Sequence, residues 1–237
     1  MLNLRKKLPD QEQGFTLVEV LVAILITTVF VATAMQAVVI AAVFKARAKQ
    51  FSEATNWIQE DLESVRQQAT IVGYTTLSAA PNPASPSLLS VSSTTGFANG
   101  NKLQITTATT TFSTTISSIS GNTITVNSAL TPAQISATLA GTPVSLIATG
   151  STDTTLCYSN AQNNGFGEFL RNNLPTLNNT KNITGATYTL SRNATVRNVE
   201  PFDLLQIRYS VAQGTKPPVA TLNTEVIPNA AFQCPPY

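Results

Sequence analysis

The sequence predicts an α+β protein in which a long N-terminal helix, transmembrane in its first half, packs on an antiparallel β head with a small Thr-rich β insertion. Three observations lead to this fold class. A long apolar run follows residue 14, an amphipathic helical pattern continues that run, and the rest of the chain contains short β-branched runs separated by turn residues. The 237 residues are enough for one or two compact domains with their own cores.

The composition argues against an enzyme. Charged residues make up 11% of the chain, against roughly 25% in an average soluble domain. The sequence contains no histidine, which excludes Ser–His or Cys–His catalysis and His-ligated metal sites. The net charge of +2, without a dense basic block beyond the first residues, gives no sign of strong nucleic-acid binding. We therefore expect a non-enzymatic protein with no cofactor and no metal; paired-acid hydrolysis is the remaining enzymatic alternative.

Residues 15–44 form the most apolar stretch, and residues 20–44 carry no charge. A helix of these 25 residues would be roughly 37 Å long, which is enough to cross a hydrocarbon core of about 30 Å. Three basic residues precede the stretch and three follow it, so their number does not decide the orientation. The short basic N-terminus favours a cytoplasmic start, with the larger remainder of the chain on the other side of the membrane.

A cleaved secretory signal peptide is the alternative to a membrane anchor. Ala32, Thr33 and Ala34 resemble the small-residue cleavage site of such a peptide. The apolar run nevertheless continues for ten residues beyond Ala34 and ends in a basic cluster, which is typical of an anchor. We therefore expect an anchor.

Glu19 is the only charge within the apolar stretch. A carboxylate inside a membrane-embedded helix costs about 2.5–3.5 kcal/mol unless it reaches the interface or a cationic partner. One such partner would be an α-amine created by cleavage of the chain just upstream of Glu19.

The string GFTLVE, residues 14–19, follows a short basic leader and opens the apolar run, and it resembles the signature of type IV prepilins. This family includes type IV pilins, minor pilins and the pseudopilins of type II secretion systems. The resemblance implies that a prepilin peptidase cuts after Gly14 and N-methylates Phe15. It also implies that Glu19 meets the α-amine of a neighbouring subunit during assembly. The leader of 14 residues is longer than the shortest in the family and contains Asp10 and Glu12.

The resemblance implies a minor pilin or pseudopilin, a structural subunit of a type IV pilus or a type II secretion-like filament that serves motility, adhesion, or polysaccharide or protein export. The implied partners are the peptidase, other pilin or pseudopilin subunits, an inner-membrane assembly platform and, before assembly, membrane lipid. The implied location is the inner membrane, crossed once with the C-terminal head outside the cytoplasm, and then a filament in the periplasm or at the cell surface.

Two further possibilities concern the subtype and the function class. The N-terminal half resembles the pseudopilins of hormogonium polysaccharide secretion in filamentous cyanobacteria. The alternative function is a single-span, membrane-anchored β protein that binds a glycan or a surface partner without filament assembly. The mature N-terminus would separate the two functions, because only the filament subunit requires cleavage before Phe15.

We expect five segments along the chain: a cleaved leader at 1–14, a helix at 15–72, a linker at 73–87, the β insertion at 88–150 and the pilin-like head at 151–237. Apolar residues at alternating steps of four and three between residues 51 and 72 predict that the second half of the helix supports the head. Trp57 is expected to be a core anchor, and the pair Glu60 and Asp61 a solvated face. Gly73 and three prolines between residues 81 and 86 predict the linker.

Residues 75–155 contain 20 threonines and only two charges. Strands are predicted at residues 88–91, 102–105, 112–119, 123–126 and 144–147. Gly121 and Asn122 predict a tight hairpin between two of them. The expected architecture of this unit is a small antiparallel sandwich or barrel.

The C-terminal region is predicted to form an antiparallel sheet. Residues 205–211 alternate between apolar and polar side chains, and weaker strands are predicted at 187–190, 195–199 and 221–227. Cys157 and Cys234 are the only cysteines, and an even pair outside the cytoplasm favours a disulfide over two free thiols. In the prepilin family that the N-terminus resembles, a C-terminal loop is likewise bounded by two cysteines.

Overall fold

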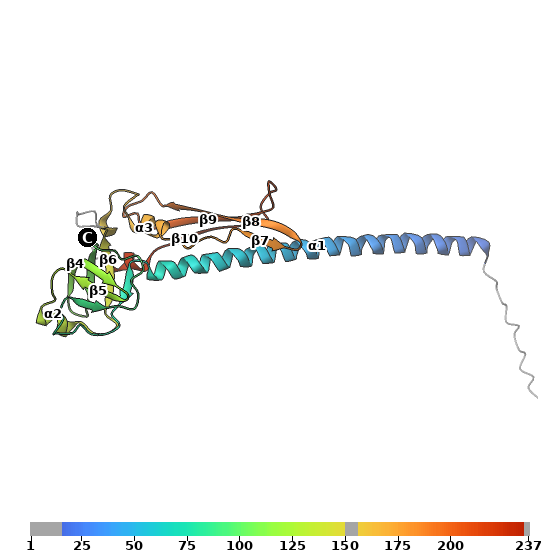
Figure 1. Cartoon of the computed structure of the whole chain (residues 1–237). Helices are drawn as coiled ribbons and strands as arrows, with labels where there is room; N and C mark the ends of the chain where they lie inside the picture. The colour runs from blue at the N-terminus through green and yellow to red at the C-terminus, as the bar shows by residue number, and fades with distance from the viewer. Residues whose placement is uncertain (1–15, 150–155, 235–237) are drawn as a thin grey trace, which may run out of the picture. The chain divides into compact units, whose positions relative to one another are not determined.

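A computed structural model describes residues 16–149 and 156–234 of the chain. The chain divides into two units, Met1–Lys49 and Gln50–Tyr237, and the helix α1 (Leu17–Ile71) has residues in both. The second unit combines the C-terminal part of α1 with two antiparallel sheets (Figure 1). The predicted α+β class, a long N-terminal helix packed on antiparallel sheets, is confirmed.

Helix α1 is uninterrupted because its sequence contains neither proline nor glycine. It starts after Thr16, whose side-chain oxygen accepts a hydrogen bond from the Glu19 amide at 3.3 Å, as an N-cap residue does. It ends two residues before Gly73, which has a φ of +65°, a left-handed conformation that glycine adopts without strain.

The sheet that packs on α1 has four antiparallel strands in the order β10-β9-β8-β7. Their bounds are Thr180–Ile183 for β7, Ala186–Val196 for β8, Leu205–Ala212 for β9 and Ala220–Val226 for β10. The apolar stripe of α1, including Trp57, Ile58, Leu62 and Val65, forms one core with the inward-facing residues of this sheet. Trp57 is 3% exposed, so its predicted role as a core anchor is confirmed.

Strand β8 corrects the sequence-based strand assignment. The sequence predicts two separate segments, at 187–190 and 195–199, whereas β8 is one strand of 11 residues. The polar residues between the two segments pair with β9, with Ser191 opposite Ser210 and Asn193 opposite Arg208. Polar residues on the solvent side of a half-buried strand do not interrupt it, and this is why the two segments join.

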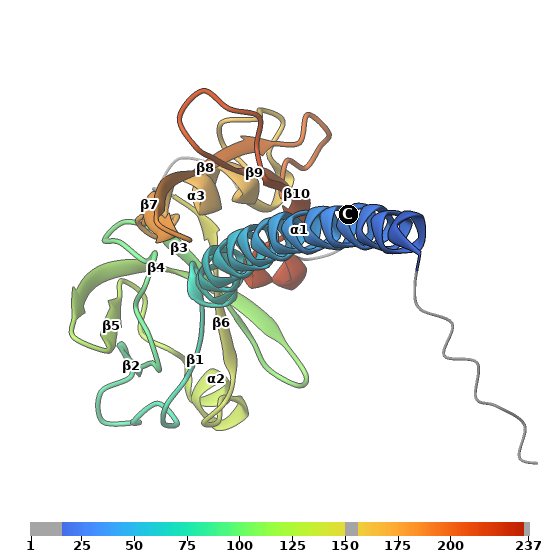
Figure 2. The ribbon, with the colours of Figure 1, turned by 90° about the vertical axis from the view of Figure 1, so that its right-hand side faces the viewer.

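The second sheet has six strands in the order β1-β6-β3-β4-β5-β2. The strands are β1 (Tyr74–Thr76), β2 (Leu88–Ser90), β3 (Lys102–Thr106), β4 (Thr111–Ser120), β5 (Thr123–Val126) and β6 (Pro143–Ala148). Just beyond the outermost strands, the Ser78 amide donates to the Ser90 carbonyl and the Ser92 amide to the Thr76 carbonyl, both at 2.9 Å. These bonds close the sheet into a barrel, the second of the two architectures that the sequence predicts (Figure 2).

The turn between β4 and β5 is the predicted two-residue hairpin. Ser120 pairs with Thr123, and Gly121 has a φ of +56°. The barrel interior is filled by aliphatic side chains, among them Leu89, Leu103 and Ile116.

Several short elements escape sequence-based prediction. Strand β1 lies inside the segment for which the sequence predicts a linker, and β7 lies in a region with no predicted strand. The helices α2 (Pro132–Ala137) and α3 (Phe166–Asn172) and the 3₁₀ helices η1 (Leu156–Tyr158) and η2 (Asn229–Gln233) are also absent from the prediction. Elements of three to seven residues are too short to show a hydrophobic period, so local capping and packing decide them.

The C-terminal end is bound to the barrel. Cys157, next to the barrel strand β6, and Cys234, just after η2, form a disulfide with their Cα atoms 5.4 Å apart. The Gln104 side chain on β3 donates a hydrogen bond to the Gln233 carbonyl at 2.7 Å. The predicted disulfide is confirmed, and it joins the start of the head region to the last described residue of the chain.

Candidate functional site

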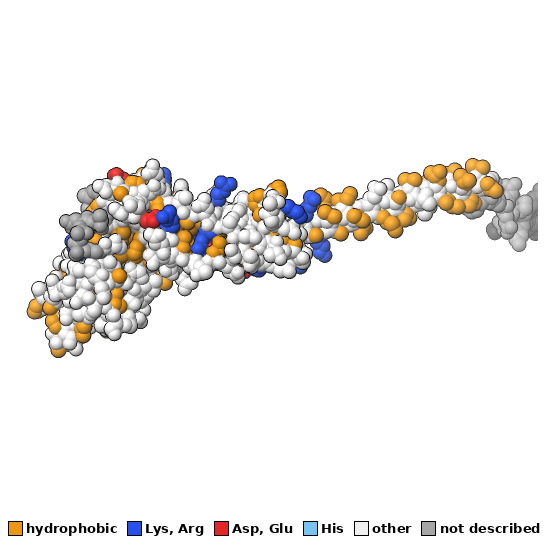
Figure 3. All heavy atoms as spheres, turned by 45° about the horizontal axis from the view of Figure 1, so that its top comes forward, with side chains coloured by type: hydrophobic (Ala, Val, Ile, Leu, Met, Phe, Trp, Pro, Cys, Tyr) orange, Lys and Arg blue, Asp and Glu red, His pale blue; other side chains and the backbone are white. Residues whose placement is uncertain are grey.

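The N-terminal part of α1 is an apolar surface. Every described residue from 16 to 49 is exposed, and the large aliphatic and aromatic side chains of residues 17–44 are among the most exposed apolar groups in the molecule (Figure 3). Within the described residues, α1 is the one helix long and apolar enough to cross a membrane. A contiguous apolar surface of this kind requires lipid or protein around it.

Three threonine hydroxyls in this apolar stretch form hydrogen bonds with backbone carbonyls of the same helix. The Thr27 hydroxyl donates to the Ala23 carbonyl at 2.7 Å, and Thr28 donates to Leu25 at 2.9 Å. Thr33 donates to the carbonyl of Phe30 at 2.9 Å. Because these hydroxyls bond within the helix, the stretch can enter a hydrocarbon environment without leaving them unsatisfied.

Glu19 lies in the first turn of α1, where the helix dipole favours a negative charge. Its side chain is exposed, and among the described residues it has no hydrogen-bonding or ion-pairing partner. Ala23 and Thr27 follow at steps of four, so Glu19 lies on the same face of the helix as two small residues. A cation that approaches this face would meet an available carboxylate beside a surface that permits close approach.

Gly14 and Phe15, the predicted cleavage and methylation residues, lie outside the described residues. Their roles stay predictions.

A buried ionic network links α1 to the four-stranded sheet, and sequence analysis missed it. Arg192 Nη1 donates to both carboxylate oxygens of Asp61, to Oδ1 at 3.1 Å and to Oδ2 at 2.9 Å. The Tyr209 hydroxyl donates to Asp61 Oδ2 at 2.8 Å. The side chains of Arg192 and Asp61 are only 9% and 10% exposed. The expectation that Asp61 belongs to a solvated face is therefore wrong.

The partners of Asp61 are held by further contacts. The Arg192 Nη2 donates to the Pro175 carbonyl at 2.6 Å. Burial raises the pKa of Tyr209 well above its ordinary value, and the hydrogen bond to Asp61 raises it further. Tyr209 is therefore a neutral hydroxyl donor, and the network is a structural connection between the helix and the sheet.

Glu60, the neighbour of Asp61, behaves as the sequence predicts. Its side chain is 66% exposed and forms a loose ion pair with Lys181, at 3.5 Å. Lys181 also lies over the Trp57 ring, 5.9 Å from its centre. No group of three or more metal-binding side chains occurs in the described part of the chain.

Comparison with known protein families places a match at the N-terminus of the chain. Residues 10–35 match the family described as "Prokaryotic N-terminal methylation motif", which is the motif of type IV prepilins and pseudopilins. The matched range includes Gly14, Phe15 and Glu19, and the resemblance is confirmed at this level. The match does not support the cyanobacterial subtype. Comparison with curated proteins and with solved structures finds no match.

Proposed function

We propose that this type IV pilin-like chain, which carries the prokaryotic N-terminal methylation motif, is a minor pilin or pseudopilin of a type IV pilus or a type II secretion-like filament. The observation that carries the proposal is that the motif runs directly into a helix whose apolar residues from 17 to 44 are all exposed. A structural subunit of this kind needs an apolar surface that contacts lipid before assembly and neighbouring subunits afterwards.

The proposed pathway starts in the inner membrane. The prepilin peptidase cuts the chain between Gly14 and Phe15 and methylates the new α-amine of Phe15. An assembly platform then transfers the subunit from the bilayer into the filament, where helices of neighbouring subunits replace the lipid. The filament would serve motility, adhesion or export.

The role of Glu19 follows from the cost of burying a charge. In a filament core, an unpaired carboxylate would be unfavourable, whereas a carboxylate next to the amine of a neighbouring Phe15 would be neutralised. Subunits with the wrong axial offset would lack this pair, so the pair would select the correct register. The exposed carboxylate and the small side chains of Ala23 and Thr27 support this role.

The disulfide between Cys157 and Cys234 supports a head outside the cytoplasm. Disulfides persist in oxidising compartments and are rare in the cytosol. A single membrane crossing by the first part of α1 is compatible with that location.

The first experiment tests processing. The chain is co-expressed with a prepilin peptidase, and the intact mass and the N-terminal residue are determined for the wild type and for Gly14→Leu. We expect methyl-Phe15 in the wild type and the uncut leader in Gly14→Leu, with Asp10→Asn as a leader control that is still cut. A wild type that retains Met1 would support the alternative, a permanent single-span anchor, and a start near Met35 would indicate a secreted protein.

The second experiment tests assembly. Glu19→Ala should be processed as the wild type is, but its amount in sheared filaments should fall at least tenfold. Glu63→Ala, which removes an exposed carboxylate from the second half of α1, is the matched control and should assemble normally. Normal assembly of Glu19→Ala would remove the proposed role of the carboxylate.

A further inference from the structure

The solvent-facing side of the four-stranded sheet carries polar residues in three ordered rows. Strand register places the members of each row side by side on β8, β9 and β10, at the strand spacing of about 4.8 Å. The rows are Ser191, Ser210 and Thr221; Asn193, Arg208 and Asn223; and Thr195, Gln206 and Glu225. The face is thus a continuous array of hydroxyl, amide and charged groups.

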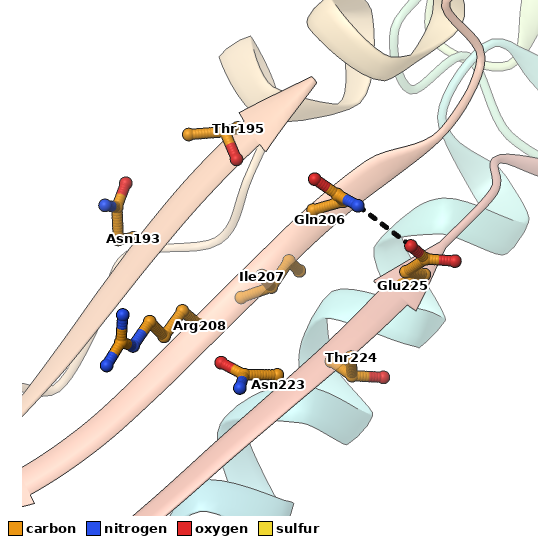
Figure 4. A pocket seen from close by; sticks show the side chains of 8 residues that line it. All are labelled: Asn193, Thr195, Gln206, Ile207, Arg208, Asn223, Thr224 and Glu225. Carbon is orange, nitrogen blue, oxygen red and sulfur yellow. Dashed lines mark hydrogen bonds between the residues drawn. The ribbon is translucent and has the colours of Figure 1, made fainter. Parts of the chain in front are cut away.

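This face is hollowed. A depression of about 480 Å³ is lined by the last two rows together with parts of Ile207 and Thr224 (Figure 4). A second depression of about 410 Å³ adjoins it, since Thr195 lines both, and it continues toward Gln162 and Arg171. Together the two depressions form an extended path suited to a chain-like ligand.

Some charged side chains along this path have a partner within the protein, and Arg208 does not, within the described residues. Glu225 accepts a hydrogen bond from Gln206 at 2.9 Å, and Arg171 is paired with Glu168 at 2.6 Å. Arg208 is exposed, and within the described residues its guanidinium has neither an ion pair nor a side-chain hydrogen bond. An exposed guanidinium between the amides of Asn193 and Asn223 presents a set of donors matched to a carboxylate.

The side chains that line the path do not fit a protein partner. Protein interfaces concentrate aromatic residues and methionine at their centre, and neither type is found among the described residues that line these depressions. Amide and hydroxyl groups can both donate and accept, which matches a ligand rich in hydroxyl groups.

We propose that this face of the head binds an acidic oligosaccharide, with a sugar carboxylate on Arg208 and sugar hydroxyls on Asn193, Asn223, Thr195 and Gln206. The site lies on the sheet face opposite α1, so it is separate from the helix surface used in assembly. It goes beyond the role of a filament subunit and holds whether or not the chain enters a filament.

The test uses the full chain in detergent micelles and a trimer of galacturonic acid as the probe, titrated by calorimetry. We expect saturable binding and at least a tenfold loss of affinity in Arg208→Gln. The methyl ester of the same trimer keeps the shape of the ligand but lacks its charge, and it should also bind at least tenfold more weakly. Arg197→Gln removes an equal charge from an exposed position that lines neither depression, and should bind as the wild type does.

Four results would overturn the proposal. The first two are the absence of saturable binding and equal binding of the trimer and its methyl ester. The third is an equal loss of affinity in Arg208→Gln and Arg197→Gln. The fourth is Arg208-dependent cross-linking between copies of the chain that added trimer does not inhibit. Glu19→Ala should bind the trimer normally, so a failure of the filament proposal would leave this measurement unaffected.

Discussion

Asp61 joins the helix to the sheet through partners on two neighbouring strands, Arg192 on β8 and Tyr209 on β9. A buried ion pair adds little stability compared with apolar residues of the same size, but the loss of one partner leaves the other as an uncompensated buried charge. We therefore expect the network mainly to fix the position of the sheet on α1, because a sheet shifted along the helix would separate Asp61 from Arg192 and Tyr209.

The first prediction concerns this network. Asp61→Leu should lower the free energy of unfolding by about 3–5 kcal/mol, because Arg192 stays buried without its counter-charge. Urea denaturation of the full chain measures the change. Glu60→Gln, which affects only a loose surface pair, should cost less than about 1 kcal/mol. The double variant Asp61→Leu with Arg192→Met should lose much less than the sum of the two single variants, and strict additivity would contradict this account.

The second prediction concerns pH. The pKa of Tyr209 is raised in the folded state, chiefly by burial, so above its ordinary value of 10.0 only the unfolded chain releases this proton. The free energy of unfolding should therefore be fully maintained below that pH and fall as the pH rises above it. Tyr209→Phe should be less stable at neutral pH but should lose this alkaline slope. Urea midpoints between about pH 8 and 11 test this, and an alkaline slope that persists unchanged in Tyr209→Phe would contradict it.

At the scale of elements, two glycines in the segment between β2 and β3 differ in their surroundings. Gly96 and Gly100 have φ values of +81° and +83°. A Cβ atom at Gly96 would lie 2.8 Å from the Gly73 amide nitrogen and from a Val72 methyl group, whereas a Cβ at Gly100 would meet nothing within 4 Å. Gly96 therefore permits this segment to lie directly against the C-terminal end of α1.

The third prediction uses this contrast. Gly100→Ala should cost about 1–2 kcal/mol of unfolding free energy, the conformational cost of a left-handed alanine. Gly96→Ala should cost about 1–3 kcal/mol more, because the methyl group also crowds a packed backbone. Thermal and urea denaturation of the two variants compare them directly. Equal losses would show that the close approach at Gly96 has no energetic consequence.

The strands show which features a sequence can reveal. The barrel strands from β2 to β6 were predictable because they are short apolar or β-branched runs with turn residues between them. Strand β1 was not, because its three residues are defined by pairing with β6, about 70 positions later in the chain. The continuity of β8 was also hidden, because the polar run of Ser191, Arg192 and Asn193 interrupts the apolar pattern and the partner of Arg192 on α1 is distant in the sequence.

The same distinction applies to the candidate sites. A processing enzyme would read a short continuous segment, so roles for Gly14, Phe15 and Glu19 could be proposed from the residue order alone, and these roles stay predictions. The row of Asn193, Arg208 and Asn223 depends on the register of three strands, and no local pattern reveals it. Asp61 was misassigned for a related reason, since the residue that covers it is 131 positions away.

At the scale of the whole molecule, the disulfide connects the barrel side of the head to the end of the chain. It spans 77 residues, which include all four strands of the α1-bound sheet. The fourth prediction is that Cys157→Ala with Cys234→Ala lowers the free energy of unfolding by up to about 4–5 kcal/mol. Hydrogen exchange should show the greatest loss of protection in η2. The wild type under reductant is the control and should match the variant, and an unchanged stability in both would contradict the prediction.

The pairing of β1 with β6 has a consequence for how such proteins diversify. Tyr74 lies opposite Ser145 and Thr76 opposite Pro143, so the backbone enters and leaves the barrel at adjacent points. Because the first and last strands of the barrel are adjacent, the whole barrel can be replaced by another domain or by a short loop that joins the same two points of the chain. The Gln104–Gln233 bond and the disulfide next to β6 are the attachments that a replacement module would have to reproduce.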